Sequence, residues 1–222
     1  MNFFGHAVVA GWFEADPRYV LGSMLPDFAS MSGTRLGDVA DPRVAAGVAL
    51  HHRTDDAFHS APVFLDLMAH VNASLASTDV GWGTARAVAH VGSELLLDGV
   101  YLARHATAPY VRALDVAHGL AAEQNLGAAF RDGGEGFERV LARLRDAGPP
   151  HAYRDPIRVA EFLDRALARR PRLRFQPGDR PHVIRALERL QPVVTERADE
   201  LLAYLREHEL LRVDTLRDTT AP

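Results

Sequence analysis

The sequence predicts an all-α protein, a single-domain bundle of about eight helices. Apolar residues recur at helical spacing along almost all of the 222 residues, and the alternating β-branched pattern of strands is missing. Pro follows Asp or Ala at several points, as expected where helices begin. We therefore expect one domain over residues 1–213, followed by a loose C-terminal tail over residues 214–222.

The expected helices follow these signals in order. A first apolar run ends at Asp16-Pro17, and Asp41-Pro42 supplies an N-cap and a first-turn proline for the next helix. Ala61-Pro62 begins another, and a loop with Asp and Gly separates it from a long Ala- and Leu-rich helix. The eight expected helices cover residues 3–13, 41–60, 61–77, 84–104, 109–125, 135–146, 156–169 and 180–210.

Composition excludes several kinds of chemistry. The chain has no cysteine, which removes disulfides, thiolate metal sites and cysteine nucleophiles. It has no lysine, so Schiff-base chemistry and the lysine of phosphate-binding loops are also excluded. The net charge of -4 gives no general attraction to nucleic acid or anionic lipid. No apolar run reaches the roughly 18 residues of a membrane span, and no targeting segment is recognisable, so we expect a cytoplasmic protein.

Several of the eleven histidines stand at helical spacing from carboxylates. His51, Asp55 and His59 follow one another every four residues, so on a helix they share one face. Consecutive members lie about 6 Å apart along the axis, which lets two of them share a metal ion. The alternative for each His-x-x-x-Asp pair is a solvated or hydrogen-bonded pair with no ion.

His90, Glu94 and Asp98 repeat this spacing on a helix whose flanking residues are apolar. Burying three ionisable groups there is costly unless a cation compensates them. Asp27, expected on a proline turn, and His6 complete the candidate ligands. Imidazole and carboxylate without thiolate suit Mn, Fe, Mg or Zn. Such an ion would polarise a phosphoryl oxygen and lower the pKa of bound water.

A basic segment concentrates positive charge in this acidic chain, with five arginines within residues 165–174. Its centre, Arg169, Arg170 and Arg172, could bind phosphates or carboxylates, because the guanidinium fork matches both. The alternative is a solvated helix end, where cations are also favoured.

In order along the chain, these residues resemble the acyl carrier protein phosphodiesterase family. Met-Asn-Phe-Phe-Gly-His, ending at His6, is similar to the family's first residues, and residues 21–28 are similar to its Gly-x-x-x-x-Asp-Phe segment. The stretch from Gly47 to Asp55 is similar to its Gly-Ile-x-x-His-Arg-Arg-x-Asp core. The remaining matches are Glu94 with Asp98, and Tyr153-Arg-Asp followed by Arg-Arg-Pro-Arg-Leu over residues 169–173.

The resemblance implies an HD-domain-like metallohydrolase of lipid metabolism. Family members use a divalent cation, notably manganese, to cleave the phosphodiester between 4'-phosphopantetheine and a serine of acyl carrier protein. The family has Asp where this chain has His59 and no counterpart of His90, so the sequence leaves open whether these two are ligands. The resemblance implies metal or catalytic positions at His6, Asp27, His51, Asp55, Glu94 and Asp98.

The expected function is a metal-dependent phosphodiesterase. Arg53 would stabilise charge on the phosphoryl group, and either Asp55 or Asp27 would act as general base. The basic segment would meet acyl carrier protein, whose acidic surface favours steered encounter; neither nucleic acid nor a membrane is an expected partner. Two alternatives are a phosphohydrolase of the same fold acting on a nucleotide or phospholipid headgroup, by weak similarity to zinc-dependent phospholipase C, and a non-catalytic helical binding module.

Overall fold

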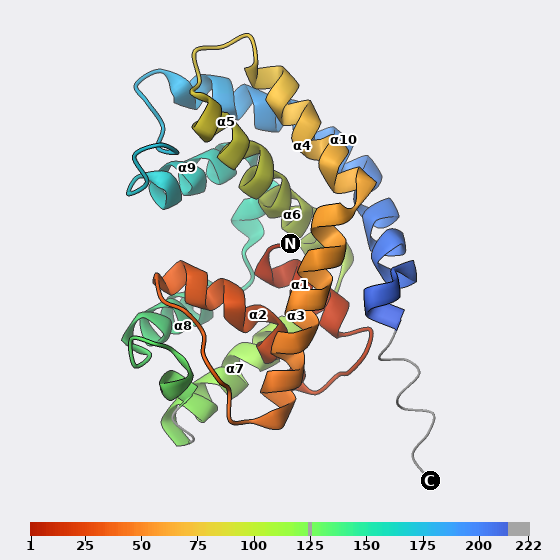
Figure 1. Cartoon of the computed structure of the whole chain (residues 1–222), viewed down its shortest axis with the longest axis vertical. Coiled ribbons are helices and arrows are strands. Elements are labelled where there is room, and N and C mark those ends of the chain that lie inside the picture. The colour runs from red at the N-terminus through yellow and green to blue at the C-terminus, as the bar shows by residue number, and fades with distance from the viewer. Residues whose placement is uncertain (124–125, 213–222) are drawn as a thin grey trace. The chain divides into compact units, whose positions relative to one another are not determined.

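The computed structural model describes residues 1–123 and 126–212, and over these residues the protein is built of α-helices, which confirms the predicted fold class (Figure 1). Short π and 3-10 turns connect some of them. The helices are α1 (Phe3–Ala10), α2 (Pro17–Ser32), α3 (Pro42–Ser60), α4 (Pro62–Leu75), α5 (Trp82–Ala87), α6 (Ser93–Arg104), α7 (Ala108–Glu123), α8 (Glu135–Ala147), α9 (Pro156–Leu167) and α10 (Asp179–Glu207).

The chain forms two compact units. The first contains residues 1–57 and 104–150 together with the described residues from 207 on, and the second contains residues 58–103 and 151–206. The single domain over 1–213 stays a prediction, and the expected tail over 214–222 lies outside the described residues, as do the last two residues of the helix expected over 109–125. No described helix is both long and apolar enough to cross a membrane.

The core of the first unit is aromatic where α1, α2 and α7 meet. The ring of Phe3 lies 5.7 Å from that of Phe28 on α2 and 5.9 Å from that of Tyr110 on α7, measured between centroids. All three side chains are almost fully buried. Burial of such large rings stabilises this unit strongly, and it fixes α1 and α2 beside each other.

The structure corrects the prediction of a proline turn before Asp27, because this residue lies inside α2. The side chain of Asp16 accepts a hydrogen bond from the Arg18 backbone at 2.8 Å, and Pro17 occupies the first turn, so the helix begins with strong start signals. It continues through Pro26 to Ser32. Buried apolar residues on both sides of Pro26 offset the hydrogen bond that this proline cannot make.

The second unit contains α4, α5, α6, α9 and α10. The single helix expected over 84–104 is divided here by a π-helical turn over Val88–Gly92, named η1. At Gly99 on α6, an added Cβ would collide with the carbonyl oxygen of Tyr153, so the chain after α8 passes tightly over α6. The ring of Phe58 packs 4.2 Å from that of Phe64 in the core of this unit.

Candidate metal centres

The first candidate centre depends on a close crossing of α2 and α3. A Cβ at Gly47 would collide with the Tyr19 carbonyl oxygen and lie 2.8 Å from the Cα of Gly22. Glycine at both crossing positions therefore lets the two backbones touch. The crossing places the Ser23 carbonyl oxygen 2.8 Å from Nδ1 of His51. A carbonyl only accepts hydrogen bonds, so Nδ1 carries the proton and Nε2 keeps its lone pair.

His51 is held as a neutral imidazole. Its side chain is almost fully buried, and its ring stacks on that of His6 with 3.9 Å between centroids. Burial and the neighbouring His6 lower the pKa of His51 to about 3, although the Asp55 carboxylate acts in the opposite direction. The unprotonated Nε2 lies 3.6 Å from Oδ2 of Asp55. The lone pair of Nε2 and the Asp55 carboxylate are therefore close together, and both are hydrogen-bond acceptors.

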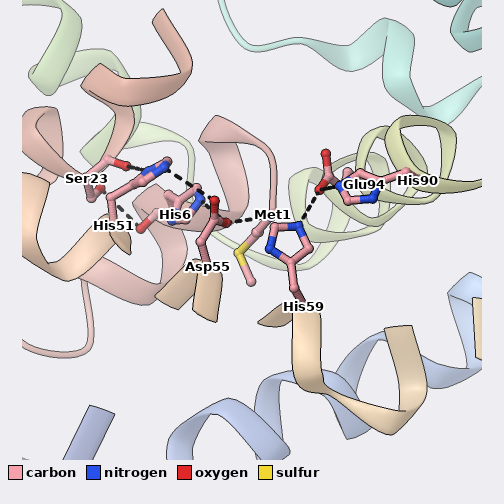
Figure 2. A network of polar contacts seen from close by, with 8 residues as sticks. All are labelled: Met1, His6, Ser23, His51, Asp55, His59, His90 and Glu94. Carbon is pink, nitrogen blue, oxygen red and sulfur yellow. Dashed lines mark hydrogen bonds and ion pairs between the residues drawn. The ribbon is translucent and has the colours of Figure 1, made fainter. Parts of the chain in front are cut away.

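Two nitrogen groups lie around the other oxygen of Asp55. Oδ1 lies 2.9 Å from the N-terminal nitrogen of Met1 and 3.2 Å from Nε2 of His6 (Figure 2). Burial raises the pKa of the Asp55 carboxyl, but the hydrogen bond with His6 and the N-terminal ammonium charge lower it more, so it lies well below its usual range. Asp55 is therefore ionised at neutral pH.

Asp27 completes this group, which we call the first centre: His6, Asp27, His51 and the adjoining Asp55. One ligand atom from each of His6, Asp27 and His51 lies within 4.8 Å of the others. They come from α1, α2 and α3, so the ligand set forms only when the first unit folds. Imidazole nitrogens and carboxylate oxygens together suit a divalent Mn, Fe or Zn ion.

The second centre consists of His59, His90 and Glu94, whose ligand atoms also lie within 4.8 Å of one another. Oε1 of Glu94 lies 3.3 Å from Nε2 of His59 and 3.2 Å from Nε2 of His90. Figure 2 shows the three side chains turned toward one another. Burial raises the pKa of Glu94, but hydrogen bonds with the two histidines contribute to lowering it below its usual range. The ring of Phe64 makes T-shaped contacts with both imidazole rings, at 5.6 Å from His59 and 5.4 Å from His90 between centroids, so the centre has an apolar neighbour.

Two local features position the second centre. His59 lies in the last turn of α3, and Phe58 beside it is buried, so the backbone there is anchored. His90 lies in η1, where the π-helical turn changes the register between α5 and α6. Such turns occur often at functional sites because they redirect a side chain that a regular helix would place elsewhere.

The other predicted site residues lie outside these two groups. Asp98 is fully buried on α6, four residues beyond Glu94, and its role as a ligand stays a prediction. Arg53 is half-buried on α3 between His51 and Asp55. The arginines of the basic segment, Arg165, Arg169, Arg170, Arg172 and Arg174, are all exposed.

Sequence reasoning missed the groups that orient the ligands. The Ser23 carbonyl is invisible to residue patterns because it is a backbone atom brought near His51 by packing. The two glycines of the crossing were a usable signal, since Gly22 and Gly47 interrupt helices at a cost that close packing repays. The π-helical turn has no local sequence signature.

No family model matches the chain, and no curated protein or solved structure matches it either. The resemblance to acyl carrier protein phosphodiesterases therefore stays a prediction from motifs.

Proposed function

We propose that the protein is a metal-dependent phosphodiesterase that hydrolyses the phosphopantetheine–serine diester of acyl carrier protein or a related diester. The observation that carries the proposal is the contact between His51 and Asp55. An unprotonated Nε2 lies 3.6 Å from a carboxylate oxygen, and both are electron-rich. A cation bound between the two groups would interact favourably with both of them. This arrangement therefore favours a metal site over a solvated polar pair without an ion.

The donor set of the first centre fits a divalent Mn, Mg, Fe or Zn ion. The resemblance to acyl carrier protein phosphodiesterases places Mn first among them. When bound, the ion would polarise a phosphoryl oxygen and lower the pKa of a water molecule. The Ser23 carbonyl holds His51 in the tautomer that offers Nε2. Asp55 and Asp27 are the candidate proton acceptors, and the guanidinium of Arg53 supplies positive charge for the phosphoryl oxygens.

The basic segment supports a protein substrate of acidic character. Its five arginines are exposed, and within residues 1–123 and 126–212 none of them forms an ion pair. Unneutralised positive charge on a chain of net charge -4 favours encounter with an acidic surface.

The test replaces His51 with Ala and compares it with His52→Ala, the exposed neighbour on the same helix. Each protein is stripped with chelator, loaded with Mn²⁺, and measured for bound metal and for release of phosphopantetheine from holo-carrier protein. His51→Ala should lose one metal equivalent and at least about a hundredfold in rate, because a missing ligand disables both ion and water. His52→Ala should behave as the unchanged protein.

Two results would contradict the proposal. If the wild-type protein retains no stoichiometric metal after loading, the alternative of a non-catalytic helical binding module is supported. Retained metal with hydrolysis only of nucleotides or phospholipid headgroups would support the alternative phosphohydrolase.

A further inference from the structure

A pocket of about 610 Å³ adjoins the second centre, and both lie within the second unit. His90 belongs to the wall of the pocket and to the group His59, His90 and Glu94. This volume falls in the range of small-molecule sites, and one wall is apolar, formed by Met68, Leu75 and Val80. A ligand in the pocket would therefore lie between an apolar wall and a potential metal ion.

The pocket also carries an available positive charge. Arg86 and Trp82 both line it, and the guanidinium lies 5.5 Å from the centroid of the indole ring. In the part of the chain that the structure describes, no carboxylate pairs with Arg86. Trp82 is 77 % exposed, so its indole ring is accessible to a ligand in the pocket that it lines.

The basic segment is fixed against the same helix, α5. A Cβ at Gly83 would collide with the Arg172 carbonyl oxygen, and the Thr84 hydroxyl donates a hydrogen bond to the Arg174 carbonyl at 3.2 Å. The backbone of the basic segment therefore contacts the first turn of the helix that carries Arg86. The positive charge of the basic segment therefore adds to that of Arg86 around α5.

We propose that the pocket binds a phosphate ester with an apolar organic group, through a metal ion held by the second centre. Two imidazoles and one carboxylate leave coordination positions open for a ligand oxygen. Arg86 neutralises the remaining phosphate charge, and the apolar wall takes the organic group. The inference rests on the proposed function only for the choice of phosphate as the anion.

The test measures binding of benzylphosphonate, whose phosphorus–carbon bond resists hydrolysis, so the readout is independent of turnover. The chain has two tryptophans, and a Trp12→Phe background makes Trp82 the sole reporter of fluorescence. Calorimetry with the unsubstituted chain checks the values. Zn²⁺-loaded protein should bind benzylphosphonate at least tenfold more tightly than inorganic phosphate or benzyl alcohol, and EDTA should abolish the difference.

Variants separate the parts of the proposed site. Arg86→Gln should weaken benzylphosphonate binding at least tenfold, whereas Arg189→Gln, an exposed arginine on α10, should leave it unchanged. His90→Ala should remove the dependence on Zn²⁺; this side chain is 42 % exposed, so the fold should tolerate the change. If EDTA, Arg86→Gln or removal of the benzyl group leaves the affinity unchanged, this inference is wrong, and the proposed hydrolysis of carrier protein is still tested separately. If the wild-type protein binds benzylphosphonate as expected but does not hydrolyse holo-carrier protein, the proposed function is wrong and this inference stands.

Discussion

His51 shows how a single backbone contact prepares a metal ligand. A histidine must be neutral to bind a metal, and protons compete with the ion at acidic pH. Burial lowers the pKa of His51 to about 3, so this competition is absent throughout the neutral and mildly acidic range. The hydrogen bond to Ser23 also selects the tautomer. His51 is therefore neutral and in the correct tautomer before the ion binds, which raises the affinity for the ion. Keeping the buried imidazole neutral lowers the stability of the metal-free protein at acidic pH.

That cost predicts acid sensitivity of the metal-free protein. Below the ordinary pKa of about 6.5 the unfolded chain binds a proton at His51, whereas the folded chain does not until about pH 3. Stability therefore falls as pH decreases through this window, by about 2 kcal/mol between pH 7 and pH 5 from this residue. Urea unfolding in EDTA at the two pH values measures the difference.

The matched variants are His51→Gln, which does not titrate but can donate to the Ser23 carbonyl, and His52→Gln. The first should reduce the loss between pH 7 and pH 5 by about 2 kcal/mol, and the second should show only the change of an exposed histidine. An equal pH dependence in wild type and His51→Gln would show that His51 titrates normally in the folded protein.

At the scale of elements, the crossing of α2 and α3 determines whether the first centre exists. Ser23 and His51 belong to different helices, and their contact requires the backbones to touch at Gly22 and Gly47. A side chain at either glycine would push the helices apart. The ligand geometry is thus a consequence of helix packing.

Gly47→Ala should destabilise the protein by about 2–4 kcal/mol, because the added methyl group meets backbone atoms that cannot move aside. It should also lower metal affinity at the first centre. Gly119→Ala on α7 is the control, since nothing lies within 4 Å of its Cβ position. That change should be neutral or stabilise by up to about 1 kcal/mol. Chemical denaturation of both variants tests the crossing, and equal stabilities would contradict it.

The sequence predicted what local rules determine. The His-x-x-x-Asp and His-x-x-x-Glu pairs make the expected contacts four residues apart. Regular helical spacing brings His51 toward Asp55, whereas His90 approaches Glu94 from the π-helical turn η1. The sequence named His6 as a ligand, but it could not predict the stacking of His6 on His51, because that contact depends on tertiary packing. Pro26 misled the prediction of α2, because the cost of an internal proline is outweighed by burial of its neighbours.

At the scale of the whole molecule, charge is distributed unevenly. Acidic residues outnumber basic ones, 29 to 25, yet five arginines fall within residues 165–174. Backbone hydrogen bonds at Arg170, to Leu167 and from Leu173, keep the segment in a defined turn. The side chains are then free to serve an approaching anion, and long-range attraction is strongest at low salt.

Arg170→Glu should lower kcat/KM for acyl carrier protein about fivefold to tenfold at low ionic strength and less than about twofold near 0.5 M salt, because salt screens the encounter. Arg189→Glu makes the same charge change on α10, outside the basic segment, and should have a smaller effect at every salt concentration. Hydrolysis of a small diester should be unaffected by either variant, since it lacks an extended acidic surface. Rates measured across the salt series separate docking of the carrier protein from the chemical step. If the rate loss at Arg170→Glu is independent of salt, or if the small diester shows the same loss, the basic segment acts on the reaction itself and not on recognition of the carrier protein.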